Sequence, residues 1–280
     1  MLLKDIVQNT ILTFELSGVE TPALDARLLI AHALDVDRLY LLNHAQDPIT
    51  DSQVEEIRAL IIRRLTRESV ARIIGYREFW GLRFDLNEAT LEPRPDSETL
   101  IEAALKISPT PRRILDIGTG TGCLLLALLH EWPEAAGVGL DIAPRAIEQA
   151  TQNAQNLDLC NRTIFHESDW LSALLPDEKF DLILSNPPYI PSDDIATLQP
   201  EVYEYDPLLA LDGGVDGLDP YRFLIPQLHR HLNRKGHVLF EVGIEQAPLV
   251  QALLQEHGFQ DVYTAKDLGG ISRCVGGALN

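Results

Sequence analysis

Apolar positions along the chain follow two periods, and the change from one to the other divides the sequence. From Leu2 to about Arg72, apolar residues recur at the three- to four-residue spacing of amphipathic helices, as they do between Val54 and Leu65. Pro22 and Asp51 or Ser52 stand where such helices would begin. The first part of the chain is therefore predicted to be a small helical bundle.

From Arg112 onward, short apolar runs alternate with segments of helical period. The expected strands are Arg113–Ile117, Gly137–Leu140, Thr163–His166, Phe180–Ser185, His237–Val242 and two more near Val262 and Arg273–Val275. The expected helices are Thr121–His130, Ala143–Asn156, Tyr221–Leu232 and Ala247–His257. Such alternation predicts an α/β fold with a mostly parallel sheet covered by helices on both faces. The last two strands, which no helix joins, would form an antiparallel edge.

Between these parts, Gly75 to Leu91 is rich in aromatic and apolar residues bracketed by glycine and asparagine, which predicts a short β-hairpin or linker. The run Glu92–Pro95 contains two prolines and stops regular structure. Asp96 or Ser97 is then expected to cap the next helix. The chain is thus predicted to have three parts, a helical domain at 1–74, a β-hairpin linker at 75–95 and an α/β domain at 96–280.

The composition is that of an ordinary globular protein, but the charge is strongly acidic. The 280 residues are 45% hydrophobic and include 23 basic against 42 acidic residues, a net charge of -19. A protein that neutralises nucleic-acid phosphates usually carries a basic face, so this balance argues against a nucleic-acid substrate. Six arginines from Arg58 to Arg77 could form a local basic patch. Solvated faces of an amphipathic helix and the following turn are the simpler interpretation.

The cysteines and the apolar runs indicate in which cellular compartment the protein is expected. The three cysteines are widely spaced and lack a Cys-x-x-Cys pair, which disfavours a disulfide framework or a zinc site and fits a reducing compartment. The longest apolar run, Cys123–Leu129, is far too short to span a bilayer, and no signal-peptide pattern is evident. We expect a cytoplasmic protein with no bound metal and no membrane contact, and a monomer as the plainest oligomeric state.

A glycine-rich segment, Leu115–Gly122, follows a predicted strand and opens a predicted helix. Glycines in such a turn let the backbone approach a ligand closely. A dinucleotide-binding fingerprint would need its third glycine at Cys123, but the glycine stands one position earlier. Asp116 at the strand end would repel a pyrophosphate and attract the sulfonium and ammonium of S-adenosyl-L-methionine. The expected cofactor-binding residues here are Asp116, Gly118, Thr119, Gly120, Thr121 and Gly122.

Further candidate residues follow the next two strands. Asp141 lies 19 residues past Gly122, where a carboxylate can accept hydrogen bonds from both ribose hydroxyls, although it could equally cap the helix near Pro144. Asp169 and Trp170 could hold the adenine amino group and ring, although a lone tryptophan is more often part of a core. Because these elements follow one another at the carboxyl ends of strands, together they predict a cofactor site.

The sequence Asn186-Pro187-Pro188-Tyr189 comes directly after the apolar run Phe180–Ser185. The prolines fix φ and remove two backbone donors, so the preceding carbonyls are free to accept hydrogen bonds. Asn186 precedes a proline and is pushed towards an extended conformation, while Tyr189 offers a flat face. Such a rim suits a planar group that bears an NH2, either an amide or the exocyclic amine of a base. The alternative is a rigid turn that closes the strand.

Together, these motifs resemble those of class I S-adenosyl-L-methionine-dependent methyltransferases that methylate amino groups. The Asn-Pro-Pro-aromatic motif is shared with DNA adenine and some RNA guanine methyltransferases, so it indicates the reaction and not the substrate. Further segments resemble the HemK/PrmC family, namely Gly75–Leu82, Pro93–Thr99, Ala210–Gly214 with Asp216–Leu218, and Lys266–Gly270 with Arg273. This sequence has Asp206 where the family usually has Glu, and Ser97 where Thr is common.

The resemblance to the HemK/PrmC family implies protein methylation in translation termination. Enzymes of this family methylate the side-chain amide nitrogen (N5) of the glutamine in the Gly-Gly-Gln loop of peptide-chain release factors, with S-adenosyl-L-methionine as methyl donor. The resemblance also implies a Rossmann-like sheet and an N-terminal domain for substrate recognition. The catalytic residues would be Asn186, Pro187, Pro188 and Tyr189, with Asn186 also beside the cofactor. The Asn186 side-chain oxygen and the Pro187 carbonyl would accept hydrogen bonds from the amide NH2, and Tyr189 would pack against the amide plane.

Two other functions stay open at this point. One is a nucleic-acid amino methyltransferase, which the acidic balance and the lack of an evident basic recognition domain disfavour. The other is a non-catalytic module that binds S-adenosyl-L-methionine or the release factor, which would have no need for the rim Asn186–Tyr189.

Overall fold

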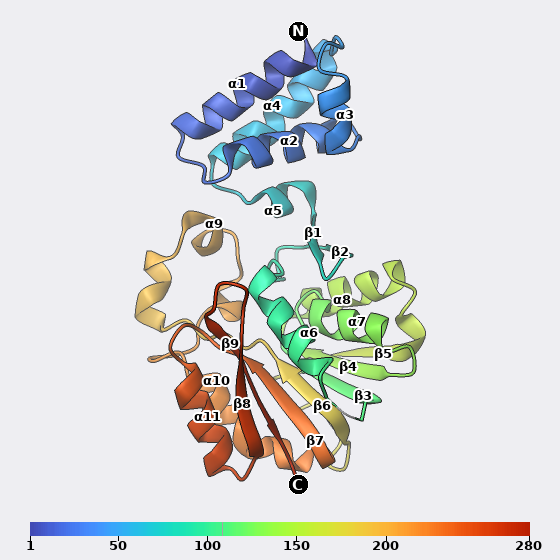
Figure 1. Cartoon of the computed structure of the whole chain (residues 1–280), viewed down its shortest axis with the longest axis vertical. Helices are drawn as coiled ribbons and strands as arrows, with labels where there is room; N and C mark the ends of the chain where they lie inside the picture. Colours follow the sequence, from blue (N-terminus) through green and yellow to red (C-terminus); the bar gives the residue numbers. More distant parts are fainter. Residues whose placement is uncertain (108) are drawn as a thin grey trace. The chain divides into compact units, whose positions relative to one another are not determined.

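The computed structural model describes residues 1–107 and 109–280, and within them the chain forms two compact units (Figure 1). The first, the helical unit, consists of Met1–Gly75 together with Gln199–Tyr205. The second, the α/β unit, consists of Tyr76–Leu198 and Asp206–Asn280. A short segment from late in the chain therefore packs with the N-terminal helices.

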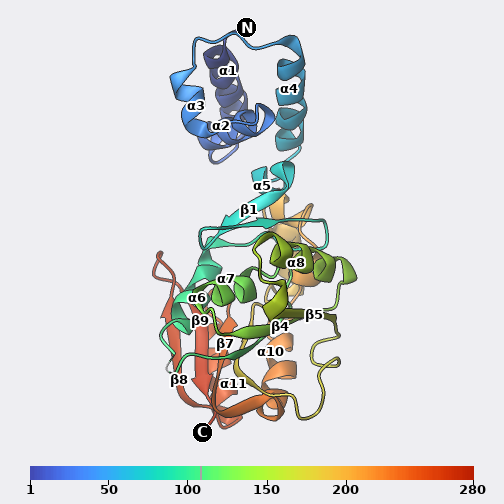
Figure 2. The same cartoon turned by 90° about the vertical axis from the view of Figure 1, so that its right-hand side faces the viewer.

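The helical unit is built from α1 (Leu3–Leu16), α2 (Pro22–Ala33), α3 (Arg38–Asn43), α4 (Asp51–Leu65), α5 (Val70–Ile74) and α9 (Pro200–Tyr203). Thr50 begins α4 with a capping box, because its hydroxyl accepts from the Gln53 backbone and the Gln53 side chain accepts from the Thr50 backbone. The helices α1, α2 and α4 pack against one another (Figure 2). Ile30 and Ile57 are fully buried in the core that they form. The predicted helical N-terminal part is confirmed.

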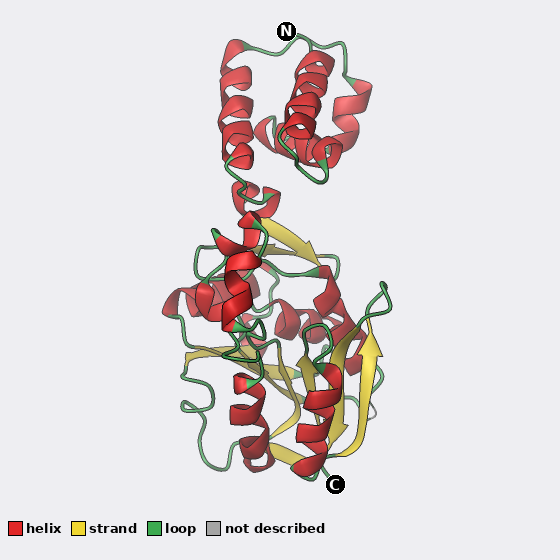
Figure 3. Cartoon of the chain, turned by 90° about the vertical axis from the view of Figure 1, so that its left-hand side faces the viewer, coloured by secondary structure: helices red, strands yellow, loops and turns green. Residues whose placement is uncertain are grey.

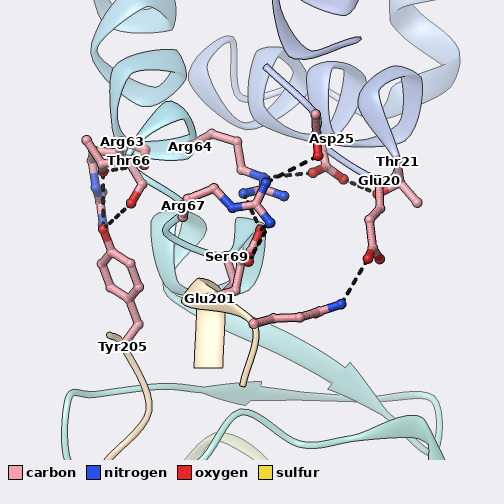
Figure 4. A network of polar contacts seen from close by, with 12 residues as sticks. Glu20, Thr21, Asp25, Arg63, Arg64, Thr66, Arg67, Ser69, Glu201 and Tyr205 are labelled. Carbon is pink, nitrogen blue, oxygen red and sulfur yellow. Dashed lines mark hydrogen bonds and ion pairs between the residues drawn. The ribbon is translucent and has the colours of Figure 1, made fainter. Parts of the chain in front are cut away.

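Charged residues of α2, α4 and α9 form an ion-pair network inside the helical unit (Figure 4). The guanidinium of Arg64 lies 2.8 Å from a carboxylate oxygen of Asp25 and 3.1 Å from one of Glu201. Arg67, just after α4, reaches the same Glu201 at 2.9 Å. We name Asp25, Arg64, Arg67 and Glu201 the arginine cluster. It ties α9 to the N-terminal helices within this unit.

The arginine cluster corrects one expectation. The sequence predicts solvated faces for the arginines from Arg58 to Arg77, but Arg64 is only 6% exposed. The prediction is wrong for Arg64 because carboxylates from α2 and α9, far away in the sequence, neutralise its charge inside the unit. The exposed Arg58, which pairs with Glu55, does lie on a solvated face.

The α/β unit begins with an antiparallel hairpin of β1 (Tyr76–Phe79) and β2 (Leu82–Asp85). The two residues of its turn, Trp80 and Gly81, both have positive φ, which matches the twist of a tight hairpin. The apolar side chains Phe79 and Phe84 are fully buried against the rest of the unit. The hairpin is therefore part of the α/β core.

A 3-10 turn, η1 (Pro95–Ser97), then leads into α6 (Glu98–Ala104). The predicted cap is wrong here: Ser97 occupies the N-cap position, but its side chain makes no capping hydrogen bond. Its hydroxyl accepts instead from the side chain of Asn186, far along the chain. Asp96 forms an ion pair with Arg273.

The α/β core is a seven-stranded sheet with the order β5-β4-β3-β6-β7-β9-β8. Its strands are β3 (Arg113–Ile117), β4 (Ala136–Asp141), β5 (Thr163–Glu167), β6 (Phe180–Ser185), β7 (Leu232–Glu241), β8 (Gln260–Lys266) and β9 (Ser272–Ala278). The strands from β5 to β7 pair in parallel, whereas β9 is antiparallel to both β7 and β8. The predicted fold class, a mostly parallel sheet with an antiparallel edge, is confirmed.

Helices cover both faces of this sheet (Figure 3). The helices α6, α7 (Cys123–Glu131) and α8 (Pro144–Asn156) lie on one face, and α10 (Asp219–Leu224) and α11 (Ala247–Glu256) on the other. Side chains of β3 alternate between the two cores, so Ile114 packs under α7 while Leu115 faces α10 and α11. Short 3-10 turns complete the unit at η2 (Cys160–Arg162), η3 (Ser192–Thr197), η4 (Leu208–Ala210) and η5 (Ile225–Arg230).

Two predicted boundaries near β7 are wrong. The sequence predicts one helix over Tyr221–Leu232, but α10 ends at Leu224 and continues as the 3-10 turn η5, in which Pro226 cannot donate a helical hydrogen bond. The strand predicted to begin at His237 already begins at Leu232, where its pairing with β6 is irregular. The first difference follows from a local proline, and the second arises because Leu232 pairs with Phe180 of β6.

Candidate active site

A cavity of about 770 Å³ lies at the carboxyl ends of β3, β4, β5 and β6. The strand order reverses at β3, which pairs with β4 on one side and β6 on the other, and ligands of open α/β sheets bind at such a point. Nine predicted site residues line the cavity, namely Gly118, Thr119, Gly120, Thr121, Asp141, Asp169, Trp170, Asn186 and Pro188. The other four do not line it, namely Asp116, Gly122, Pro187 and Tyr189.

The glycine-rich loop after β3 forms one wall of the cavity. The backbone N–H groups of Gly118 and Thr119 both donate to the Leu140 carbonyl at 2.8 Å, which pins the loop to the end of β4. Gly120 adopts a φ of 55°, which a residue with a side chain rarely adopts. At Gly122 a Cβ would lie 3.1 Å from the Leu126 side chain, so this glycine serves the packing of α7 and does not face a ligand.

Asp116 lies at the end of β3 and is fully buried. Its Oδ2 accepts a 2.7 Å hydrogen bond from the Thr119 hydroxyl, while Oδ1 has no hydrogen-bond partner among the described residues. Burial raises the pKa of Asp116 to about 7, and the nearby charge of Asp141 adds to the rise. A buried carboxylate in this state would be stabilised by a cation in the adjoining cavity.

Asp141 at the end of β4 holds the loop and borders the cavity. Its Oδ2 accepts from the Gly120 N–H and its Oδ1 from the Ala143 N–H, both at 2.9 Å. Each oxygen keeps a further lone pair that can accept a ligand hydroxyl. Burial raises the pKa of this carboxyl group as well. The N-cap position of α8 is occupied by Ala143, so Asp141 is not the cap of that helix.

Asp169 and Trp170 follow β5 in a tight turn beside the cavity. Trp170 has a φ of 52°, and the Ser168 hydroxyl fixes this conformation by donating to the Trp170 carbonyl at 2.8 Å. The Trp170 ring lies 6.0 Å from that of Phe223 and packs against the α10 and α11 core. Trp170 is therefore both a core aromatic and a cavity wall, as each of its two predicted roles requires.

The rim Asn186–Tyr189 leaves the end of β6, with Asn186 and Pro188 on the cavity. The Asn186 side-chain amide donates to the Ser97 hydroxyl at 3.4 Å. The Tyr189 hydroxyl points into the protein and donates to Glu241 at 3.4 Å. Burial and the charge of Glu241 raise the pKa of Tyr189, which keeps that phenol protonated.

The loop that contains Gly213 and Gly217 packs against the rim. Its Gly217 lies so close that a Cβ there would sit 2.2 Å from the Tyr189 carbonyl oxygen. The Gln246 side chain donates to the same carbonyl at 2.9 Å and, more weakly, to that of Gly217 at 3.3 Å. These contacts thus fix the end of the rim at Tyr189.

Three residues of this site were not among the predicted ones: Ser97, Glu241 and Gln246. Ser97 carried a competing signal, since its position before a helix is typical of a cap. Glu241 did carry a signal, because an acidic residue that ends an apolar strand has the same pattern as Asp116 and Asp141.

The charges around the cavity fit a cationic ligand. Neither Asp116 nor Asp141 forms an ion pair with an arginine or lysine within residues 1–107 and 109–280. A pyrophosphate would add charge of the same sign, whereas a sulfonium or an ammonium would compensate it. The Asp116 carboxylate, which is fully buried behind the glycine loop and paired with no arginine or lysine of the described residues, is the observation that favours such a ligand most directly.

Comparisons with known proteins match both parts of the chain. Residues 5–75 match a family model described as the PrmC N-terminal domain, and residues 111–266 match one described as a methyltransferase domain. The chain is 47% identical over 262 residues to the release factor glutamine methyltransferase of Rhodospirillum rubrum, over 93% of this chain and 80% of that protein. It is 46% identical over 263 residues to the protein of that name from Bradyrhizobium diazoefficiens, over 92% of this chain and 88% of the relative.

Among solved structures, the hMettl16 catalytic domain in complex with MAT2A 3′UTR hairpin 1 is similar in fold. The TM-score is 0.59 at 16% identity, and the match covers 85% of both chains. At this identity the likeness concerns the arrangement of the sheet and helices alone.

Proposed function

The chain belongs to the release factor glutamine methyltransferase family, and on this premise we propose which of its residues carry the reaction. It is an S-adenosyl-L-methionine-dependent enzyme that methylates the glutamine side chain of peptide-chain release factors. We propose that the methylated atom is the amide nitrogen N5 of the glutamine in the Gly-Gly-Gln motif. The observation that carries the proposal is that Asn186 faces the same cavity as the glycine loop and Asp141.

Different walls of the cavity are proposed to hold different parts of the cofactor. When bound, the cofactor supplies an electrophilic methyl group on a cationic sulfonium. Asp141 accepts hydrogen bonds from the ribose hydroxyls with the lone pairs that its backbone partners leave free. Asp169 and Trp170 hold the adenine amino group and ring. The glycine loop lets the ligand approach the backbone, and the Asp116 carboxylate favours the positive charge.

The rim is proposed to bind and orient the nucleophile. An amide nitrogen is a poor nucleophile because its lone pair is delocalised into the carbonyl group. The Asn186 Oδ1 and the Pro187 carbonyl each accept one N–H of the glutamine amide, which holds the nitrogen in line with the methyl group. Both acceptors also stabilise the positive charge that develops on the nitrogen, and the excess proton then leaves to water. Tyr189 follows the two prolines without lining the cavity itself, and it is proposed to pack against the amide plane.

The remaining assignments are proposals of the same kind. We propose that residues 1–74 recognise the release factor, that 75–95 link the parts and that 96–280 carry out the transfer. A net charge of -19 supports a protein substrate over a nucleic acid, and we propose a monomer in the cytoplasm. Among the helices of the described residues, none has the length and apolar character to cross a membrane.

Methyl transfer from labelled S-adenosyl-L-methionine tests the substrate. We expect label on a release factor and none on its variant with Gln→Ala in the Gly-Gly-Gln loop. Duplex DNA and ribosomal RNA serve as competing acceptors in the same assay. Label on either nucleic acid, or none on the release factor, would overturn the proposal.

The Asn186→Ala variant tests the rim. Because it removes one acceptor for the glutamine amide, we expect kcat to fall by at least about 100-fold, with little change in the affinity for S-adenosyl-L-methionine measured by calorimetry. Near-normal turnover in this variant would contradict the assignment of Asn186.

A further inference from the structure

A single positively charged side chain stands among the acidic residues of the cavity. Among the described residues that line the cavity, Arg94 is the one arginine, lysine or histidine. Five carboxyl side chains line it as well, namely Glu92, Asp141, Asp169, Asp212 and Asp219. None of the roles proposed for the other lining residues involves this cation.

Arg94 is held in place by its backbone and by one ion pair. It stands between Pro93 and Pro95 with extended backbone angles, a φ of -97° and a ψ of 140°, as expected of a residue before a proline. Its Nη2 lies 2.5 Å from a carboxylate oxygen of Asp206, whose side chain is 2% exposed, while the Arg94 side chain is 35% exposed. Burial raises the pKa of Tyr189, and the positive charge of Arg94 opposes the rise. Arg94 is therefore anchored near the rim, with part of its side chain accessible.

The guanidinium of Arg94 has room for a second carboxylate. An arginine carries five N–H donors in a planar fork, so it can bind two carboxylates at once. Two other arginines of this chain do so, because Arg64 lies within 3.1 Å of two carboxylates and Arg273 within 3.3 Å of two. Within the described residues, Arg94 has one such partner, Asp206.

One group of S-adenosyl-L-methionine is negatively charged and needs a partner of this kind. The methionine part carries a carboxylate beside its ammonium, whereas the sulfonium and the ammonium are positive. A further carboxylate is repelled by the five carboxyl side chains on the cavity wall. Burying it without a counter-charge would be costly. Arg94 is the lining residue whose charge can compensate it.

The glycine loop offers little to a carboxylate. Four of its backbone N–H groups, those of Gly118, Thr119, Gly120 and Gly122, already donate to oxygen atoms of the chain at 2.8 to 2.9 Å. The Thr119 hydroxyl donates to Asp116, whose buried carboxyl group would repel an anion next to the loop. The ammonium side of the methionine part suits this wall, and the carboxylate side needs another.

We propose that Arg94 binds the carboxylate of S-adenosyl-L-methionine, with Asp206 as the positioning residue that holds the guanidinium at the cavity wall. Arg94 then bridges one carboxylate of the chain and one of the cofactor, as Arg64 bridges two carboxylates of the chain. Such a contact distinguishes S-adenosyl-L-methionine from its decarboxylated analogue, which keeps the adenosine, the sulfonium and the amine. The inference rests on the proposed function, because it assumes that the cofactor lies in this cavity.

Calorimetry with two ligands tests the contact, namely S-adenosyl-L-methionine and its decarboxylated analogue, in which a hydrogen atom replaces the carboxylate. We expect the wild type to bind S-adenosyl-L-methionine about 10- to 100-fold more tightly, because the analogue lacks the charge-assisted hydrogen bonds to Arg94. In Arg94→Gln, the affinity for S-adenosyl-L-methionine should fall by about the same factor, whereas that for the analogue should not fall. A purely structural role of Arg94 would weaken the binding of both ligands alike.

Two further variants keep the test readable. Arg94→Gln leaves the buried Asp206 without its cation, so this variant can fail to fold. The double variant Arg94→Gln/Asp206→Asn removes both charges together, and it should lose the preference for S-adenosyl-L-methionine as well. Arg94→Lys keeps the charge without the planar fork and should retain part of the preference.

Arg113→Gln is the matched control, since Arg113 begins β3 at the end of the strand away from the cavity and pairs with Glu178. Its ratio of the two affinities should equal that of the wild type. An Arg94→Gln variant that keeps the wild-type preference would overturn the inference, as would a wild type that binds both ligands equally. A preference that persists while the KM for release factor rises would place Arg94 on the substrate instead, which also overturns it. The ratio is measured without release factor, so it decides the role of Arg94 even if methyl transfer fails and the proposed function is refuted.

Discussion

Buried charges occur in both units of this protein, but they are treated in opposite ways. In the arginine cluster of the helical unit, Arg64 is matched by two carboxylates, Asp25 and Glu201. In the α/β unit, Asp116 and Glu241 are fully buried, and each keeps one oxygen without a hydrogen-bond partner within the described residues. In the first arrangement each charged group meets an opposite charge within 3.1 Å, whereas neither carboxylate of the second forms an ion pair within the described residues.

The difference teaches where to look for a ligand. An unpaired buried carboxylate is costly, and folding alone would select against it. Burial raises the pKa of both Asp116 and Glu241 to about 7, so the neutral form of each becomes accessible near neutral pH. Both residues lie at strand ends next to the cavity or its rim. The paired charges of the arginine cluster stabilise the fold. The unpaired carboxylates Asp116 and Glu241 have perturbed pKa values, which cluster at functional sites.

The largest effect is expected from breaking the ion pairs of the arginine cluster. Arg64→Leu leaves Asp25 buried without its cation, which should destabilise the helical unit by about 3–5 kcal/mol. Hydrogen exchange localises the loss: amides of α2, α4 and α9 should lose protection by this amount. We expect Glu201 to keep its bond to Arg67 and so to lose less than Asp25 does.

Two measurements control this prediction. Arg58→Leu removes an exposed arginine that pairs with Glu55, and it should cost less than about 1 kcal/mol. The three tryptophans, Trp80, Trp132 and Trp170, all lie in the α/β unit, so their fluorescence reports its unfolding separately. Equal protection factors in Arg64→Leu and the wild type would mean that the arginine cluster does not hold the helices.

The second-largest effect is expected at Asp116, the buried carboxylate next to the cavity that forms no ion pair within the described residues. A bound cation lowers the pKa of a carboxyl group, so S-adenosyl-L-methionine should bind the ionised form of Asp116 more tightly than the protonated form. Because the pKa without ligand is about 7, affinity should rise as the pH rises through 7 and fall below it. The expected loss is up to about tenfold, or about 1.4 kcal/mol, per pH unit.

Calorimetry at several pH values measures this linkage, and buffers of different ionisation enthalpy count the protons released. Asp116→Asn cannot ionise and should bind more weakly, with an affinity that no longer depends on pH near 7. Asp181→Asn is the control, since Asp181 binds the backbone of Arg112 and Arg113 at the far end of β6. An affinity of the wild type that stays constant across pH 7 would show that Asp116 does not sense the cofactor's charge.

Much of the fold follows from local pattern. The strands β3 and β6 begin and end at the predicted residues, because each is a short apolar run bounded by polar residues. The glycine spacing at Gly118–Gly122 is local too, and it distinguished a sulfonium cofactor from a dinucleotide. Features that depend on a few neighbouring residues are therefore readable from one sequence.

Features that depend on partners far away in the chain are not. The segment Gln199–Tyr205 joins the helical unit through Glu201, whose partner Arg64 lies 137 residues earlier. Ser97 has the local signal of a cap but is used by Asn186, 89 residues later. In both cases a polar side chain satisfies a distant group, and no local periodicity records that pairing.

The smallest effect is expected where the Tyr189 hydroxyl meets Glu241 beneath the rim. Tyr189→Phe keeps the flat ring but removes the hydroxyl that donates to Glu241 over a long 3.4 Å. Such a bond is worth about 0.5 kcal/mol, so kcat should fall about twofold. The same loss of a donor should raise the pKa of Glu241 by about 0.4 unit, which NMR of the carboxyl group measures. A loss of kcat much larger than twofold would mean that this hydroxyl does more than hold Glu241, and a lowered pKa of Glu241 would mean that it does not stabilise the carboxylate.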